Sequence, residues 1–221
     1  MPREAYQGNL REMQDEVLVI GSMIEKALEN SMRALKTRDL ELAKQVIDED
    51  SKVNKKRFEI EERLLDTMSC QSPMASDLRI LLTILSIVTD LERMGDHAAG
   101  NAKIALMIGD EPPLKPLIDL PRMNDKVIDM LHRSLNAFIS HDAEVARKIV
   151  LEDDEVDNLY DQVFRELLTF MIEDPRTITR ATRLIWVGHN LERTGDRVTN
   201  ICERVVFMVT GKMEELNVST Y

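Results

Sequence analysis

The sequence contains an internal repeat, which limits the possible folds more strongly than any other feature. Two shifts of the numbering superimpose identical residues from the two halves of the 221-residue chain. A shift of 103 places Asp39, Glu41, Ala43, Glu49, Asp50 and Val53 on Asp142, Glu144, Ala146, Glu152, Asp153 and Val156, and a shift of 100 places Leu91, Glu92, Arg93, Gly95 and Asp96 on Leu191, Glu192, Arg193, Gly195 and Asp196. The chain is therefore expected to fold as two copies of one unit, produced by gene duplication.

Both copies are expected to be entirely helical. Glycine (8 residues) and proline (7) are few and aromatic residues make up 4% of the chain, whereas charged residues make up 31%. This composition favours long amphipathic helices over strands. Between residues 79 and 97, an apolar face that includes Leu81, Leu85 and Val88 lies opposite a polar stripe. The stripe consists of Arg79, Thr83, Ser86, Asp90, Arg93 and His97, and we expect His97 to face solvent.

Capping residues and helix breakers divide the chain into six helices. Asp39 and Asp142 are typical N-caps at equivalent positions of the repeat, and Ser72-Pro73 and Asp174-Pro175 are equivalent breaks. The expected helices cover residues 4–37, 39–71, 74–108, 122–140, 142–173 and 176–210. Short connections make consecutive helices antiparallel, so the predicted fold class is all-α, with two tandem antiparallel three-helix bundles. The first bundle is expected in residues 1–110, a linker in 111–121 and the second bundle in 122–221.

Charge and cysteine usage exclude several classes of function. The net charge of −11 disfavours general binding of nucleic acid or anionic lipid, because both carry the same sign of charge. No run of 18 apolar residues indicates a membrane span, and the first residues lack the apolar core of a signal peptide. Cys70 and Cys202 are expected to be free thiols in a reducing cytoplasm.

Four pairs of oxygen-bearing side chains occur at i, i+4 spacing, which places both members of a pair on one helix face. The pairs are Asp50 with Asn54, Glu92 with Asp96, Asp153 with Asp157, and Glu192 with Asp196. Residues equidistant from the turn of an antiparallel hairpin lie side by side. In the first hairpin, the midpoints of the two pairs are residues 52 and 94, and their average is 73, the position of Pro73 in the turn. In the second hairpin, the midpoints are residues 155 and 194, and their average is 174.5, next to Pro175 in the turn. Each half is therefore expected to bring two pairs together in one oxygen-rich cluster.

Close carboxylates repel one another, so each cluster needs a proton, a basic side chain or a metal ion nearby. Oxygen ligands suit hard cations such as Mg²⁺, Ca²⁺, Mn²⁺ or iron, which makes a metal site one interpretation. The other interpretation is that Arg93 and Arg193, which directly follow Glu92 and Glu192, neutralise the charge in ion pairs.

Gly95 and Gly195 occupy one repeat position inside predicted helices, where glycine costs about 1 kcal/mol relative to alanine. Close approach of a second helix, or access to the cluster, would explain a glycine at this position in both copies. Duplication without a present role is the alternative explanation.

Three further residues near the second cluster are expected to be structural. His189 lies one turn before the second glutamate, but its repeat equivalent is Thr89, so a ligand role is not favoured. Trp186 is expected in the core. Cys202 is expected to be a small buried residue rather than a metal ligand.

The most specific motif is the duplicated L-E-R-x-G-D, found as L-E-R-M-G-D at 91–96 and L-E-R-T-G-D at 191–196. With it the chain resembles the PhoU family, which carries an L-E-R-[IM]-G-D signature on the third helix of each bundle. The A-S-D-L-R run at 75–79 and the V-I-x-x-D-x-x-V-[ND] run at 46–54 also match. The resemblance covers about residues 5–210 and includes the tandem duplication.

The resemblance implies a non-enzymatic regulator of phosphate uptake and phosphate-starvation signalling. Members of the family are cytoplasmic and act with the ATPase of the phosphate ABC transporter and with its sensor histidine kinase. They restrain uptake and keep starvation genes off when phosphate is plentiful. A homodimer is expected, with no nucleic-acid partner and with membrane contact only through the partner proteins.

The resemblance also implies bound metal, because some members carry iron or zinc clusters on E(D)xxxD motifs. Carried over by motif, the expected ligands are Glu92, Asp96, Asp153, Asp157, Glu192 and Asp196, with Asp50 and Asn54 at the fourth motif, and the expected metal is iron, zinc, manganese or magnesium. Asn54 departs from the pattern, because an amide supplies no charge. The first site is therefore expected to be weaker or to hold fewer metal ions.

Two other functions are weighed beside the adaptor. A ferritin-like carboxylate-bridged metal protein would need E-x-x-H motifs, and no glutamate here is followed by histidine three residues later. A metal-free helical scaffold, whose carboxylates contact only basic side chains, is the second alternative.

Overall fold

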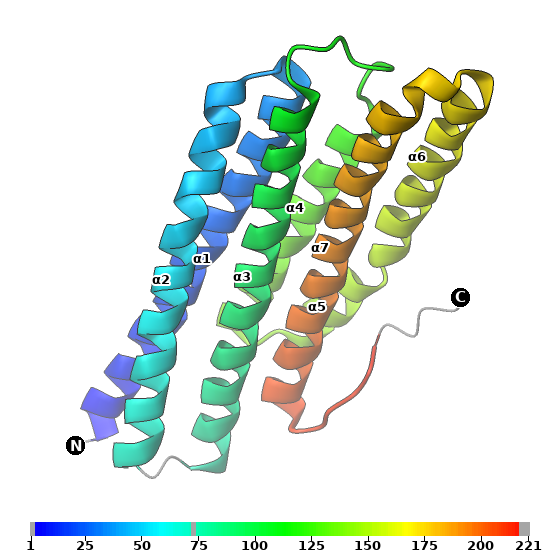
Figure 1. Cartoon of the computed structure of the whole chain (residues 1–221). Coiled ribbons are helices and arrows are strands. Elements are labelled where there is room, and N and C mark those ends of the chain that lie inside the picture. The colour runs from blue at the N-terminus through cyan, green and yellow to red at the C-terminus, as the bar shows by residue number, and fades with distance from the viewer. Residues whose placement is uncertain (1–2, 72–73, 217–221) are drawn as a thin grey trace.

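The computed structural model describes residues 3–71 and 74–216, and no β-strand forms in these ranges. The first half consists of α1 (Arg3–Thr37), α2 (Leu40–Gln71) and α3 (Ala75–Ile108), and the second of α4 (Asp119–Ser140), α5 (Ala143–Val150), α6 (Asp153–Glu173), the 3₁₀ turn η1 (Pro175–Thr177) and α7 (Ile178–Thr210). Each half is an antiparallel three-helix bundle, as the sequence predicts (Figure 1).

Local sequence signals account for most helix ends. Asp39 and Asp142 are N-caps: a carboxylate oxygen of Asp39 accepts a hydrogen bond from the Leu42 amide, and Asp142 accepts from two amides of α5. Asp174 ends α6 and caps η1, whereas the predicted break at residues 72–73 lies outside the described residues. Helix α4 begins at Asp119, three residues earlier than predicted, because proline is tolerated in the first turn of a helix.

The prediction of one continuous helix over residues 142–173 is wrong. Two turn residues, 151 and 152, separate α5 from α6. The repeat register is the same before and after this point, so the break is not an insertion. At the break, Glu152 forms a bidentate ion pair with Arg133 of α4 at 2.6 and 2.8 Å, and Lys126 lies 2.7 Å away.

This charge network is the physical reason for the break. Arg38 and His141, which follow α1 and α4, both adopt the left-handed conformation, so the shift of 103 also aligns these two helices. It places Met23 and Asn30 at the positions of Lys126 and Arg133. At these two positions the first half lacks a basic side chain; Glu49, the equivalent glutamate, pairs instead with Lys52 of α2 itself at 3.8 Å, and α2 continues without interruption.

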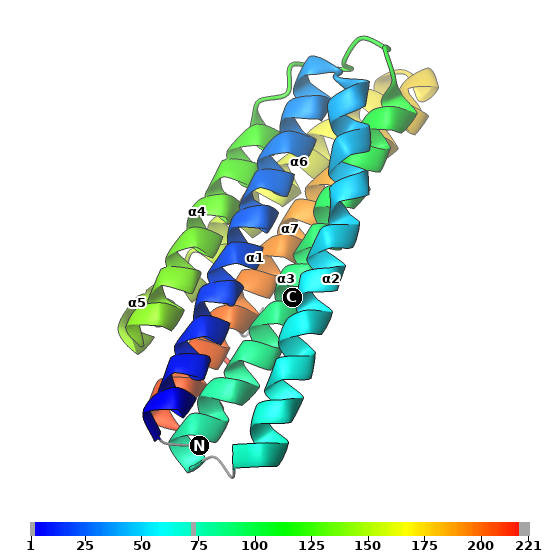
Figure 2. The same cartoon turned by 90° about the vertical axis from the view of Figure 1, so that its left-hand side faces the viewer.

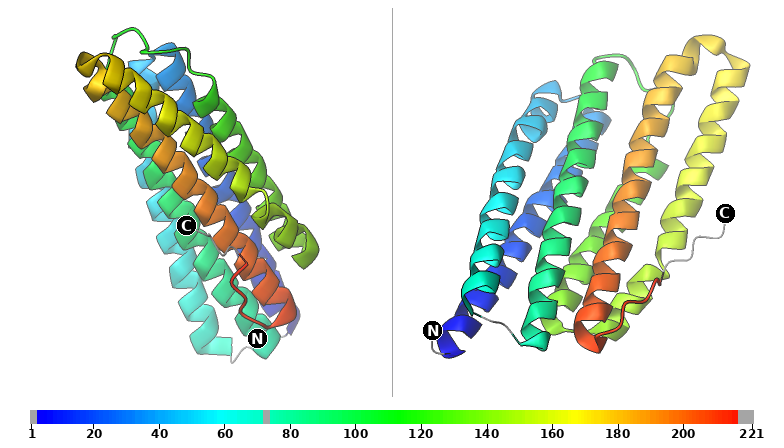
Figure 3. Two further views of the ribbon diagram at one scale, coloured as in Figure 1. Left: turned by 90° about the vertical axis from the view of Figure 1, so that its right-hand side faces the viewer. Right: turned by 60° about the horizontal axis from the view of Figure 1, so that its bottom comes forward.

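The two halves meet through equivalent helices that run in opposite directions. Helices α3 and α7 lie side by side in the centre of the molecule (Figure 1), with α1 and α4 side by side in a second layer (Figure 2). Helices α2 and α6 form the two outer edges (Figure 3). The Thr83 hydroxyl near the start of α3 donates to the Arg204 carbonyl near the end of α7, which confirms the antiparallel direction.

The core lies along the inner faces of the helices, and the expected apolar face of α3 is only partly buried. Leu81 and Val88 are fully buried, whereas Leu85 is 37% exposed beside the groove between α3 and α7. From the expected polar stripe, Thr83 and Asp90 are buried against α7 instead of facing solvent. Within residues 3–71 and 74–216, no helix combines the length and apolar character needed to cross a bilayer.

The connection from α3 to α4 is held by both halves. Arg38, which follows α1, donates a hydrogen bond to the Asp110 carbonyl at 3.2 Å. Lys115 is 8% exposed and forms an ion pair with Glu166 of α6. These contacts fix the linker against the end of α1 in the first half and against α6 in the second.

Candidate functional site

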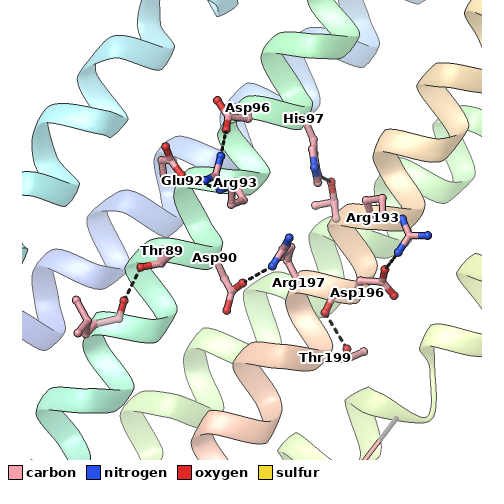
Figure 4. Close-up of polar contacts among 12 residues, drawn as sticks. Thr89, Asp90, Glu92, Arg93, Asp96, His97, Arg193, Asp196, Arg197 and Thr199 are labelled. Atoms are coloured by element: carbon pink, nitrogen blue, oxygen red, sulfur yellow. Dashed lines mark hydrogen bonds and ion pairs between the residues drawn. The ribbon is translucent and has the colours of Figure 1, made fainter. Parts of the chain in front are cut away.

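The predicted oxygen-bearing pairs form two clusters, one in each half. The first cluster consists of Asp50, Asn54, Glu92 and Asp96, and the second consists of Asp153, Asp157, Glu192 and Asp196. Within each signature, the arginine pairs with both acids, and Figure 4 shows Arg93 beside Glu92 and Asp96, and Arg193 beside Asp196. Arg93 lies 3.6 Å from Glu92 Oε2 and 3.2 Å from Asp96 Oδ2, and the corresponding distances from Arg193 are 3.1 and 2.8 Å. The ion pairs that the sequence suggested are therefore present.

A glycine on the third helix brings each cluster together across its hairpin. A Cβ atom built on Gly95 would lie 3.1 Å from Asp50 Oδ1, and one on Gly195 would lie 2.7 Å from Asp153 Oδ1. The carboxylate from α2 or α6 thus lies directly against the backbone of α3 or α7. This contact confirms the level placement inferred from the turn midpoints, and it explains why glycine occupies this position in both copies.

Several cluster oxygens are buried without a hydrogen bond. Among the described residues, no hydrogen-bond partner reaches Asp50 Oδ1, Glu92 Oε2 or Glu192 Oε2, although arginines pair electrostatically with both glutamates. Glu92 is 8% exposed and Glu192 is 7% exposed. Buried acceptors without a donor are costly, so these atoms favour a proton or a cation.

The clustered acids also raise one another's pKa. Burial, with repulsion from Asp196, raises the pKa of Glu192 to about 7 against the attraction of Arg193. Burial and Asp196 likewise raise the pKa of Asp157. In the first half, burial raises the pKa of Asp50, and Asp96 and Glu92 add to the effect.

The ligand atoms of the clusters are of the type that binds a cation, but the side chains are not arranged as a complete coordination site. Carboxylate oxygens with unsatisfied buried acceptors are the ligand type that hard cations prefer. In the part of the chain that the structure describes, however, no three His, Cys, Asp or Glu side chains are arranged to hold a metal ion as they stand. A bound cation would need to take over carboxylate contacts that Arg93 and Arg193 now make.

Sequence reasoning missed Arg57, which belongs to the first cluster. Its Nη1 atom lies 3.3 Å from Glu92 Oε2, and its side chain is 18% exposed. Asn54, one turn earlier on α2, donates a hydrogen bond to Asp50 Oδ2 at 3.4 Å. The i, i+3 spacing from Asn54 could have placed Arg57 on the cluster face.

The prediction that Trp186 lies in the core is wrong, since it is 56% exposed. Leu184 and Val187 take the core positions of this turn of α7. Trp186 instead belongs to an aromatic patch in which Trp186 and Phe164 are exposed and Tyr160 and His189 are half-buried. Its ring centroid lies 5.9 Å from that of His189, which lies 6.2 Å from Tyr160, and Tyr160 lies 6.4 Å from Phe164. The patch adjoins the second cluster, since His189 Nδ1 is 3.9 Å from Glu192 Oε2.

The expectation that His97 faces solvent is also wrong, because the residue lies between the two halves. Its Nδ1 atom is 3.3 Å from Thr194 Oγ1 (Figure 4). Burial lowers the pKa of His97 to about 4, and the nearby positive charge of Arg197 contributes. Arg197 in turn pairs with Asp90 at 3.2 Å, so a row of polar contacts joins α3 to α7.

Cys202 is fully buried, as expected. Burial raises the pKa of its thiol to about 12, so the side chain stays protonated and is a poor metal ligand. Cys70 is exposed at the far end of α2.

Comparison with known proteins connects this geometry to one family. The family model described as "PhoU domain" matches twice, at residues 17–105 and 120–205. The "Phosphate-specific transport system accessory protein PhoU homolog" of Clostridium acetobutylicum is 37% identical over 98% of this chain and 100% of its own length. The accessory protein PhoU of Escherichia coli K12 is 34% identical over 94% of this chain and 86% of its own.

Two solved structures are similar over nearly the whole chain. The phosphate transport system regulatory protein PhoU from Streptococcus pneumoniae gives a TM-score of 0.89 at 30% identity, covering 95% of this chain and 99% of the other. PhoU from Pseudomonas aeruginosa gives a TM-score of 0.90 at 34% identity, covering 94% and 100%.

The glycine contact predicts a steric penalty for Gly195→Ala. Asp153 is 1% exposed and cannot move away from a new methyl group, so we expect a loss of about 1–3 kcal/mol in the free energy of unfolding, measured by urea denaturation. The control is Gly8→Ala, where nothing lies within 4 Å of the added carbon and stability should rise by at most about 1 kcal/mol. Equal changes in the free energy of unfolding for the two substitutions would contradict the close contact between Gly195 and Asp153.

The position of His97 predicts instability in acid. Its folded pKa of about 4 lies below the ordinary 6.5, so between these values the unfolded state binds more protons and the folded state loses stability as the pH falls. His97→Gln should therefore lose less thermal stability than the wild type between pH 6.5 and 4. The control, His132→Gln, alters an imidazole whose side chain is 63% exposed and should follow the wild type.

Proposed function

This chain belongs to the PhoU family, and on that premise we propose that it is a non-enzymatic regulator of phosphate uptake and of phosphate-starvation signalling. The observation that carries the proposal is similarity over nearly the full length to phosphate-specific transport system accessory proteins, with both copies of the domain present. We place the protein in the cytoplasm, as a homodimer, between the phosphate ABC transporter and its sensor histidine kinase.

The aromatic patch supports an adaptor function. Trp186 is 56% exposed and Phe164 is 41% exposed, and large exposed aromatic side chains are enriched at the centres of protein interfaces. Their repeat equivalents are Ser86 and Glu61, and the other two patch residues also have no aromatic counterpart in the first half. The patch is therefore a surface that only the second half acquired or kept. We assign it to the ATPase subunit of the transporter.

We further propose that the second cluster binds a hard cation such as manganese, magnesium or iron. Four carboxylates from α6 and α7 face one arginine there, and Glu192 has a buried oxygen without a hydrogen bond. A bound cation would supply positive charge that links the two helices of the hairpin. The aromatic patch borders this cluster, so cation binding would stiffen the helices that present the docking surface.

If the patch docks the ATPase, Trp186→Ala should weaken binding to the isolated ATPase subunit by about tenfold or more, because truncating a central aromatic residue typically costs over 1 kcal/mol. Calorimetry with the purified proteins measures the affinity. Leu65→Ala removes an apolar side chain of the first half that is 68% exposed, and it should bind like the wild type. Unchanged affinity of the Trp186 variant would exclude this surface.

If the second cluster holds a cation, protein purified without chelators should contain metal that Glu192→Gln with Asp196→Asn removes. Elemental analysis measures the metal, and circular dichroism verifies the fold. The control, Glu41→Gln with Asp48→Asn, makes the same charge change at exposed positions of α2. Metal-free wild-type protein would favour the helical scaffold, and oxygen consumption after anaerobic iron loading would favour a ferritin-like protein.

A further inference from the structure

The two carboxylate clusters differ at two positions that decide their charge. The shift of 103 aligns Asn54 with Asp157 and Arg57 with Tyr160. The first cluster therefore combines three carboxylates with the guanidinium groups of Arg57 and Arg93, whereas the second combines four carboxylates with that of Arg193. Counted in this way, the first cluster has a formal charge of −1 (three carboxylates, two guanidinium groups) and the second a formal charge of −3 (four carboxylates, one guanidinium group).

Arg57 is built into the first cluster. Its guanidinium lies 3.3 Å from Glu92 and 3.2 Å from Glu61, and it stacks on the Phe58 ring with 4.8 Å to the ring centroid. With an 18% exposed side chain, these contacts leave it little freedom to swing into solvent. A planar guanidinium fixed in this way supplies a permanent positive charge beside a buried carboxylate.

The second half has rebuilt the same place around an uncharged ring. A Cβ atom on Gly188 would lie 3.1 Å from the Tyr160 ring, so the glycine makes room for the tyrosine. The repeat equivalent of Gly188 is Val88, which is fully buried in the first half. The exchange of arginine for tyrosine is thus accompanied by a matching change on the facing helix.

We infer that Arg57 is a resident counterion that takes the place of a cation in the first half, so that this chain binds its cation at the second cluster alone. The inference rests on the proposed cation site and adds to it a division of roles between the halves. A divalent ion entering the first cluster would meet the repulsion of two guanidinium groups, of which that of Arg57 is held in place, and would find only three carboxylates. At the second cluster it meets one guanidinium and four carboxylates.

Manganese binding tests the inference, with the unbound Mn²⁺ measured by electron paramagnetic resonance. The wild type should show one class of sites, which Glu192→Gln with Asp196→Asn abolishes and Glu92→Gln with Asp96→Asn leaves intact. Asn54→Asp with Arg57→Gln should create a second class of sites. Glutamine replaces the arginine because it removes the charge while keeping a side chain of similar polarity. Arg57→Lys, which keeps the charge, is the control and should keep one class.

The outcomes separate the inference from the proposed function. Two equivalent classes in the wild type, each lost with its own pair of acids, would overturn the inference and leave cation binding standing. No second class in the Asn54→Asp, Arg57→Gln protein would also overturn it. No binding by folded wild type would refute the cation site itself.

A metal-free measurement then decides the role of Arg57. In excess chelator, Arg57→Gln should lower the thermal midpoint, because it leaves Asp50, Glu92 and Asp96 with less positive charge nearby, while Arg57→Lys should lower it less. Equal thermal midpoints for the wild type and Arg57→Gln would overturn the inference that Arg57 acts as a resident counterion.

Discussion

In each half, a carboxylate from the second helix lies against a glycine on the third, and the rest of the arrangement depends on this contact. Any side chain larger than hydrogen at Gly95 or Gly195 would meet an aspartate oxygen within 3.1 Å. The close approach buries acidic groups that water would otherwise solvate, so positive charge must be supplied from elsewhere. Arg93 and Arg193 supply part of it in the two halves alike.

The remaining need for positive charge is met differently in the two copies. The first half supplies Arg57, whereas the second half has Tyr160 at the equivalent position, in ring contact with His189, which lies 3.9 Å from Glu192. The two clusters of the duplicated scaffold therefore differ in charge, with two guanidinium groups in the first and one in the second.

The halves are joined by polar contacts rather than by apolar packing alone. Asp90 pairs with Arg197, and His97 contacts Thr194, which lies between the two acids of the second signature. Buried polar contacts of this kind fix the register of two helices, because a slip of one turn would leave each group without its partner. These contacts tie the turn of α7 that carries the second signature directly to α3.

The sequence alone determined most of the helices, their aspartate caps, the two bundles and the oxygen-bearing members of both clusters, because these depend on periodicity, turn residues and spacing within one hairpin. Only the tertiary structure decided which side of α3 faces α7, and hence the burial of His97 and the exposure of Trp186. It also decided the break after α5, which depends on basic side chains of α4, and the pairing of Arg57 with Glu92. Such contacts join segments that are distant in sequence, so no local pattern along the chain specifies them.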